Sequence, residues 1–157
     1  MQDLVCACNL GFPDVVSLIL EIKAGDAEFM TEIFGNEKSQ KTPLIHSAIY
    51  NQPECFRFLI PLSNLNHRHN GHGTTALLQT LIYGHEECAL LLLKEPEIDI
   101  NVGDNCGYTP LMAACKNRLI RATALLIKMG ADKEAQDMFG ATATLEAQEF
   151  PEILELL

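Results

Sequence analysis

A period of 33 to 34 residues constrains the fold of this chain more than any other feature of its sequence. Three segments repeat one pattern: KTPLIHSAIYNQPECFRFLI, TTALLQTLIYGHEECALLLL and YTPLMAACKNRLIRATALLI. A threonine marks the same position in these copies and in a fourth, shorter one: Thr42, Thr75, Thr109 and Thr142. Units of this length cannot bury their apolar faces alone. The period therefore predicts a stack of similar units that share one continuous core.

Each copy predicts two short helices. The threonine can cap the first helix, and the proline that often follows it suits the first turn. The second helix carries apolar residues at helical spacing, as Phe56, Leu59 and Ile60 do. A weaker copy, LVCACNLGFPDVVSLIL, opens the chain. The break between the two helices, where glycine or asparagine suits a left-handed backbone, falls in the four longer copies at Gly11, Asn51, Gly84 and Arg118.

The period and the segments TPL, YGHEEC, DINVGDNCGYTPL and MGADKEAQDMFGATA resemble the ankyrin repeat family over essentially the whole chain. The resemblance implies an all-α solenoid of stacked helix-turn-helix units, with hairpin-like finger loops along one edge. We expect one domain over residues 1–157, with the end repeats either capping the array or marking a piece of a longer one. The expected repeats lie at about 1–25, 41–66, 74–101, 108–133 and 141–157.

The link at about residues 25–40 is longer than the other links. Its apolar residues either fold back over the core or contact a partner: Phe29, Met30, Ile33 and Phe34.

Composition limits the classes of function. The 157 residues are 48% hydrophobic, enough for one domain with a core, and the formal net charge is −10. Such a chain repels nucleic acid and anionic membranes, and its apolar runs are too short to span a bilayer. Six widely spaced cysteines without a secretory signal favour reduced thiols and an intracellular location, in the cytoplasm or the nucleus. We expect a monomer that inserts into no membrane and binds no nucleic acid.

The segment NHRHNGHG, residues 66–73, raises the question of a metal site. His67, His69 and His72 fill positions that vary between repeats, in a finger loop. His67 and His69 share one face of an extended arm, and three imidazoles with an open position would suit zinc. No nearby acid is apparent to orient them. We expect a solvated finger without a metal. A metal- or redox-responsive switch that uses these histidines and Cys106 is an alternative.

No catalytic motif is present: the chain has no Gly-x-Ser-x-Gly, no phosphate-binding Gly-rich loop and no zincin helix. We expect no enzymatic activity and no cofactor. In GHEEC, the resemblance implies a structural role for His85, with a local hydrogen bond in the turn between two helices.

The resemblance implies that a protein or peptide partner lies against the finger loops and the exposed, concave side of the first helices. Tyr50 and Tyr83 are 33 residues apart and should lie in register on neighbouring repeats; the alternative is that they merely cover their helices. We expect a non-enzymatic interaction module, in which lysines orient an acidic group of the partner. A regulatory fragment of a larger protein, such as a kinase, is the alternative. The candidate partner-binding residues are Lys41, Tyr50, His72, Tyr83, Tyr108, Lys116, Met138 and Phe139.

Overall fold

A computed structural model of the chain describes residues 2–23, 26, 42–69 and 71–157. The expectations for the long link, and for Lys41, lie outside these residues. Throughout the described part the only regular elements are helices, so the fold is all-α, as expected. The α-helices, with the short 3-10 helix η1 (Ile60–Leu62) after α5, are α1 (Gln2–Leu10), α2 (Pro13–Lys23), α4 (Pro43–Ile49), α5 (Pro53–Leu59), α6 (Ala76–Ile82), α7 (Glu86–Leu92), α8 (Pro110–Lys116), α9 (Ile120–Lys128), α10 (Ala143–Glu146) and α11 (Pro151–Leu154).

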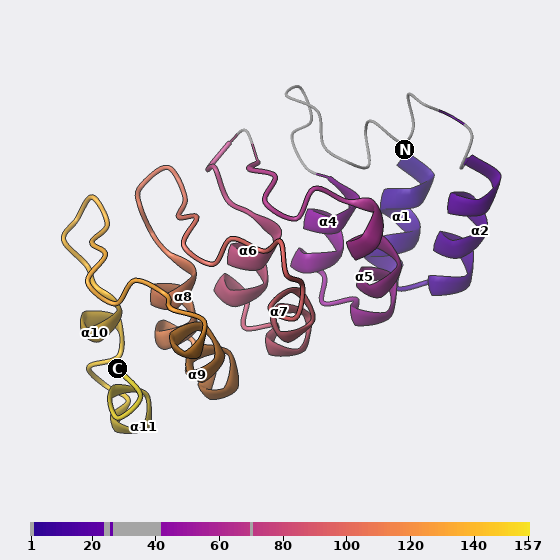
Figure 1. Cartoon of the computed structure of the whole chain (residues 1–157). Coiled ribbons are helices and arrows are strands. Elements are labelled where there is room, and N and C mark those ends of the chain that lie inside the picture. Colours follow the sequence, from indigo (N-terminus) through magenta and orange to yellow (C-terminus); the bar gives the residue numbers. More distant parts are fainter. Residues whose placement is uncertain (1, 24–25, 27–41, 70) are drawn as a thin grey trace.

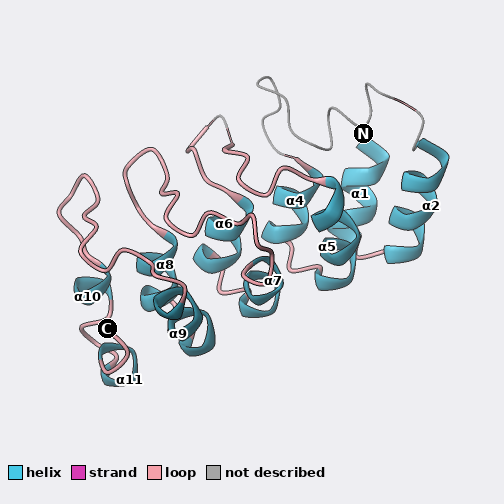
Figure 2. Cartoon of the chain, in the orientation of Figure 1, coloured by secondary structure: helices cyan, strands magenta, loops and turns pink. Residues whose placement is uncertain are grey.

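The helices form two parallel rows (Figure 1). The first helix of each pair belongs to an inner row, in which α1 packs on α4, α4 on α6, α6 on α8 and α8 on α10. The second helices form an outer row, in which α2 packs on α5, α5 on α7, α7 on α9 and α9 on α11. Each pair therefore contacts its immediate neighbours, which is the arrangement of a solenoid. The loops between pairs rise from one edge, at the amino-terminal ends of the inner helices (Figure 2).

The repeated threonines cap the inner helices as the sequence predicts. In each case the threonine Oγ1 accepts a hydrogen bond from the backbone N–H three residues later, at 3.1–3.3 Å. The inner helices end at left-handed residues, which include Asn51 (φ 53°) and Arg118 (φ 56°). A left-handed backbone reverses the chain direction, and so the outer helix can pack against the inner one.

Replacing Thr75 with alanine should lower the free energy of unfolding by about 1 kcal/mol, because the buried N–H of Leu78 loses its acceptor. For a chain of this size that corresponds to a melting temperature lower by roughly 2–4 °C. Thermal unfolding followed by circular dichroism measures the shift. The matched control is Thr75→Ser, which keeps the hydroxyl. Equal melting temperatures for the two variants would show that the cap contributes nothing.

Side chains of one repeat also terminate the inner helix of the repeat before it. Gln52 Nε2 donates to the carbonyl of Asn9 at 3.4 Å, and His85 Nε2 lies 3.0 Å from the carbonyl oxygen of Ile49. The last carbonyls of a helix have no partner within the helix, and these bonds satisfy them across the repeat interface. The role of His85 is therefore structural, but its partner lies 36 residues away and not in the local turn.

Candidate partner-binding surface

The third and fourth finger loops are held in shape by one aspartate each. Asp104 Oδ1 accepts hydrogen bonds from the backbone N–H groups of Cys106 and Tyr108, at 2.8 and 2.9 Å. Asp137 Oδ1 accepts from Phe139 and Ala141 in the same way, at 2.9 and 2.8 Å. Aspartate suits these turns because its short carboxylate can reach its own backbone two to four residues on.

Neighbouring fingers are joined through their backbones. The N–H of Asn105 donates to the carbonyl of His72 at 2.9 Å, and the N–H of Met138 donates to the carbonyl of Cys106 at 2.8 Å. These bonds hold successive fingers in register, and they position the fingertip side chains on a preorganised edge.

The most exposed large apolar side chains of the described fingers are Met138 and Phe139, in the fourth finger. Their exposed fractions are 68% and 81%. The carboxylate of Asp137 fixes the backbone beneath Phe139, so this aromatic ring projects from a defined turn.

A second apolar feature runs along the inner row. Tyr50 and Tyr83 are the C-cap residues of α4 and α6, with exposed fractions of 52% and 53%. Leu10, the last residue of α1, occupies the same position one repeat earlier and is 66% exposed. The Tyr83 ring also stacks on His85, with ring centroids 5.9 Å apart. We call Leu10, Tyr50 and Tyr83 the apolar row.

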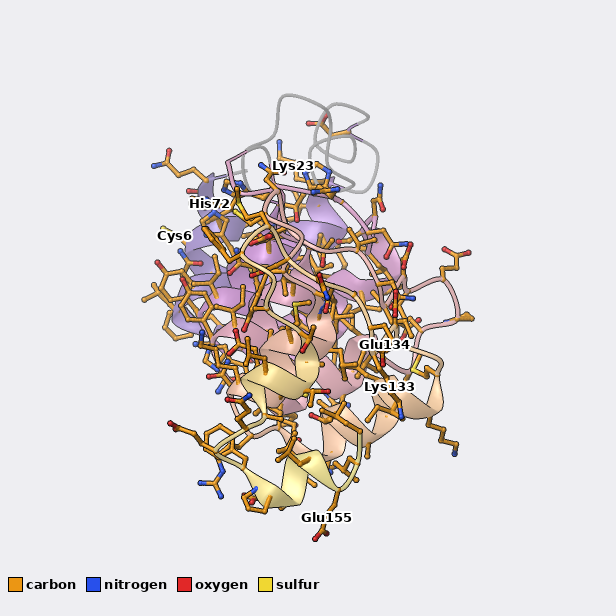
Figure 3. All side chains as sticks on the ribbon, turned by 90° about the vertical axis from the view of Figure 1, so that its left-hand side faces the viewer. Cys6, Lys23, His72, Lys133, Glu134 and Glu155 are labelled. Carbon is orange, nitrogen blue, oxygen red and sulfur yellow. The ribbon has the colours of Figure 1, made fainter. Side chains whose placement is uncertain are left out.

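We use "inner face" for the exposed side of the inner helices, which points away from the outer row. Figure 3 views the array end-on and shows Cys6 of α1 and His72 of the second finger on one side of the molecule. Lys133 and Glu134, from the link before the last repeat, lie on the other side. The finger residue His72 is thus on the same side as an exposed residue of an inner helix.

Tyr108 differs from the other two tyrosines. It precedes the cap of α8 and does not end the helix, and its hydroxyl oxygen is buried. Burial, together with the carboxylate of Glu146, raises the pKa of Tyr108 well above its ordinary value. Lys116 Nζ lies 5.8 Å from the centre of the Tyr108 ring and 3.6 Å from Glu146 Oε2. These three residues form a partly buried cluster, and Tyr108 supports Lys116 from beneath.

A hollow of about 380 Å³ lies beside this cluster. It opens between the end of α8 and the last helix pair, where Phe150 forms an aromatic wall and Arg118 stacks on the outside of that ring at 5.0 Å. The residues that line the hollow are Lys116, Leu145, Glu146, Gln148, Glu149 and Phe150.

The histidines of the second finger do not converge on one point. The rings of His69 and His72 stack with centroids 6.4 Å apart, and His69 Nδ1 accepts a hydrogen bond from the N–H of Gly71 at 2.6 Å. Among residues 2–23, 26, 42–69 and 71–157, no group of three or more His, Cys, Asp or Glu side chains is placed to hold a metal ion. Cys106 is half-buried in the next finger.

Comparison with known proteins identifies the repeats. Residues 62–137 match the family model described as ankyrin repeats (3 copies). The chain contains ankyrin repeats. With its stacked helix pairs, the fold is an ankyrin-repeat all-α solenoid, as the sequence predicted.

Two human proteins show what this ankyrin-repeat chain is similar to. One is SMC5-SMC6 complex localization factor protein 1, 51% identical over 49 residues, which cover 31% of this chain and 5% of that protein. The other is protein phosphatase 1 regulatory subunit 27, 34% identical over 85 residues, which cover 54% of each chain. The chain thus matches about a twentieth of the first relative and about half of the second. Within the described ranges no helix is both long enough and apolar enough to cross a bilayer.

Proposed function

We propose that this chain is a non-catalytic interaction module, which holds a protein or peptide partner on its inner face and fingertips. The apolar row supports this proposal most directly, because three large apolar side chains stand at least half exposed at one position of successive repeats. Aromatic side chains on a rigid surface are typical binding hot spots, since little conformational entropy is lost when they are covered.

The fingers and the end of the inner face complete the proposed surface. Met138 and Phe139 provide a second apolar contact, and His72 lies exposed at the tip of the second finger. Lys116 can orient an acidic group of the partner when its ion pair with Glu146 opens. We keep Lys41 in the proposed surface from its sequence position alone.

The relatives fit this role. One is named as a localization factor for a protein complex and the other as a regulatory subunit of a phosphatase. Both names describe proteins that act through other proteins. We also propose an intracellular location, which the six free cysteines support.

Affinity capture from a lysate of the source cells tests the proposal. The baits are the unaltered chain, a Tyr50→Ala, Tyr83→Ala double variant and a control variant, Phe58→Ala. Phe58 is an aromatic residue of the outer row with a comparable exposed fraction, 42%. We expect mass spectrometry to find a protein that the unaltered and control baits retain and the double variant loses, with all three baits folded by circular dichroism.

Two outcomes would count against this surface. If all three baits retain the same proteins, the partner lies elsewhere on the chain. If the outer-row variant loses the partner and the double variant keeps it, the binding surface is the opposite side of the array.

A further inference from the structure

We propose that the partner segment on the apolar row is an α-helix, which places apolar side chains seven residues apart on Leu10, Tyr50 and Tyr83. This inference rests on the proposed function and names the kind of partner that the first three repeats receive. Its argument has three steps: the charge of the inner face, the spacing of the row, and the hydrogen-bonding capacity of the backbone beneath it.

The inner face of the first three repeats carries no formal charge beside the row. Besides the row itself, each inner helix presents two part-exposed or exposed side chains on this side, one and four residues before the row residue. Neither set contains a carboxylate, an ammonium or a guanidinium group, although 20% of the chain is charged and its net charge is −10. These side chains are Cys6 and Asn9, His46 and Ile49, and Gln79 and Ile82.

Charge returns to the same positions in the last two repeats. Lys116 stands one repeat beyond Ile82, and Glu149 stands one repeat beyond Lys116. Charged residues are depleted at the cores of protein interfaces, where aromatic residues are enriched. The neutral half of the inner face thus has the composition of an interface core, and it fits an apolar stripe of a partner better than a charged segment.

The spacing of the row selects a helix over a strand. Inner helices α1, α4 and α6 pack side by side, and packed helices lie about 8–10 Å apart. The row has one residue per repeat and so the same interval. A helix rises about 1.5 Å per residue, so side chains seven residues apart are roughly 10.5 Å apart and lie on one side. Side chains on one face of a strand recur at about 6.6 or 13 Å, which does not match.

The backbone beneath the row offers nothing to an extended chain. The carbonyls at the ends of the inner helices are already bonded: Asn9 to Gln52, Ile49 to His85 and Ile82 to Asn117, the last at 3.1 Å. An extended segment must find partners for its own N–H and C=O groups, whereas a helix satisfies them internally. A polyproline II segment would match the interval, at about 9.3 Å per three residues. It has no such internal bonds and is the main rival.

Panning of three displayed peptide libraries against the full chain tests this inference. All peptides have 22 residues. The first library is helix-forming with leucine fixed at positions 4, 11 and 18. The second has the same composition with leucine at positions 4, 9 and 16, which do not share a face. The third is proline-rich. We expect enrichment from the first library, and a Kd for the selected peptides that rises at least about tenfold with Tyr50→Ala or Tyr83→Ala and stays unchanged with Phe58→Ala.

Enrichment only from the second or third library overturns the helix inference, as does a Kd that neither tyrosine substitution changes. Peptides that lose affinity with Phe139→Ala but not with Tyr83→Ala also overturn it, while they leave the proposed function intact because they bind at a fingertip. If no library yields a binder, the helix inference falls, and the lysate capture still decides the proposed function separately.

Discussion

Phe56→Ala is expected to lower the free energy of unfolding by about 3–5 kcal/mol, the usual cost of removing a fully buried phenylalanine side chain. Phe56 is 0% exposed and lies in α5, which packs against α2, α4 and α7. The side chain therefore fills the interface between the first repeat and the three that follow it. Removing the ring leaves a cavity there, and stability in a solenoid depends on such interfaces between neighbouring repeats.

Urea unfolding, followed by circular dichroism, measures this change, and Phe58→Ala is a matched control. The two residues have the same type and share one helix, but Phe58 is 42% exposed. We expect the control to lose well under half as much stability, and the midpoint of the Phe56→Ala transition to fall clearly below it. A lower slope of free energy against urea in Phe56→Ala would indicate that the first repeats unfold separately. Equal midpoints for the two variants would contradict the assigned burial.

Alkaline pH should destabilise the fold steeply through three buried thiols. Burial raises the pKa of Cys8 and of Cys88 to about 12 and that of Cys115 to about 11. In the unfolded chain a cysteine has a pKa of about 8.5. Between these values the unfolded state has lost protons that the folded state keeps. The stabilising effect is complete below about pH 8.5 and is lost as the pH rises towards 11 to 12.

Each thiol can change the free energy of unfolding by up to about 1.4 kcal/mol per pH unit in this window. We expect urea unfolding at pH 7.5, 9 and 10, with a reductant present, to show stability falling from pH 9 to 10. The variant Cys88→Ala should be less stable at pH 7.5 because it has a small cavity, but its stability should fall less steeply with pH. The control is Cys6→Ala, which removes an exposed thiol and should keep the slope of the unaltered chain. Identical slopes in both variants would show that Cys88 does not contribute.

The local structure of this ankyrin-repeat chain could be predicted because it depends on residues close together in the sequence. Thr75 caps its helix through an N–H only three residues away, and Asp137 shapes its finger through N–H groups two and four residues away. The alignment of Leu4 with Leu44 likewise places Leu10 in register with Tyr50. Periodicity carries such information directly, since every repeat solves the same local problem with similar residues.

The sequence by itself thus determined the solenoid, its caps, its turns and the register of Tyr50 with Tyr83. Only the tertiary structure decided which side chains of that register remain exposed. Tyr108 is a tyrosine like the other two, yet its hydroxyl is buried, and Lys116 is paired with Glu146 from the next repeat. The bond of His85 to Ile49 also crosses a repeat boundary. The physical reason is that burial and pairing depend on side chains about one repeat away, whose identities vary while the backbone period stays the same.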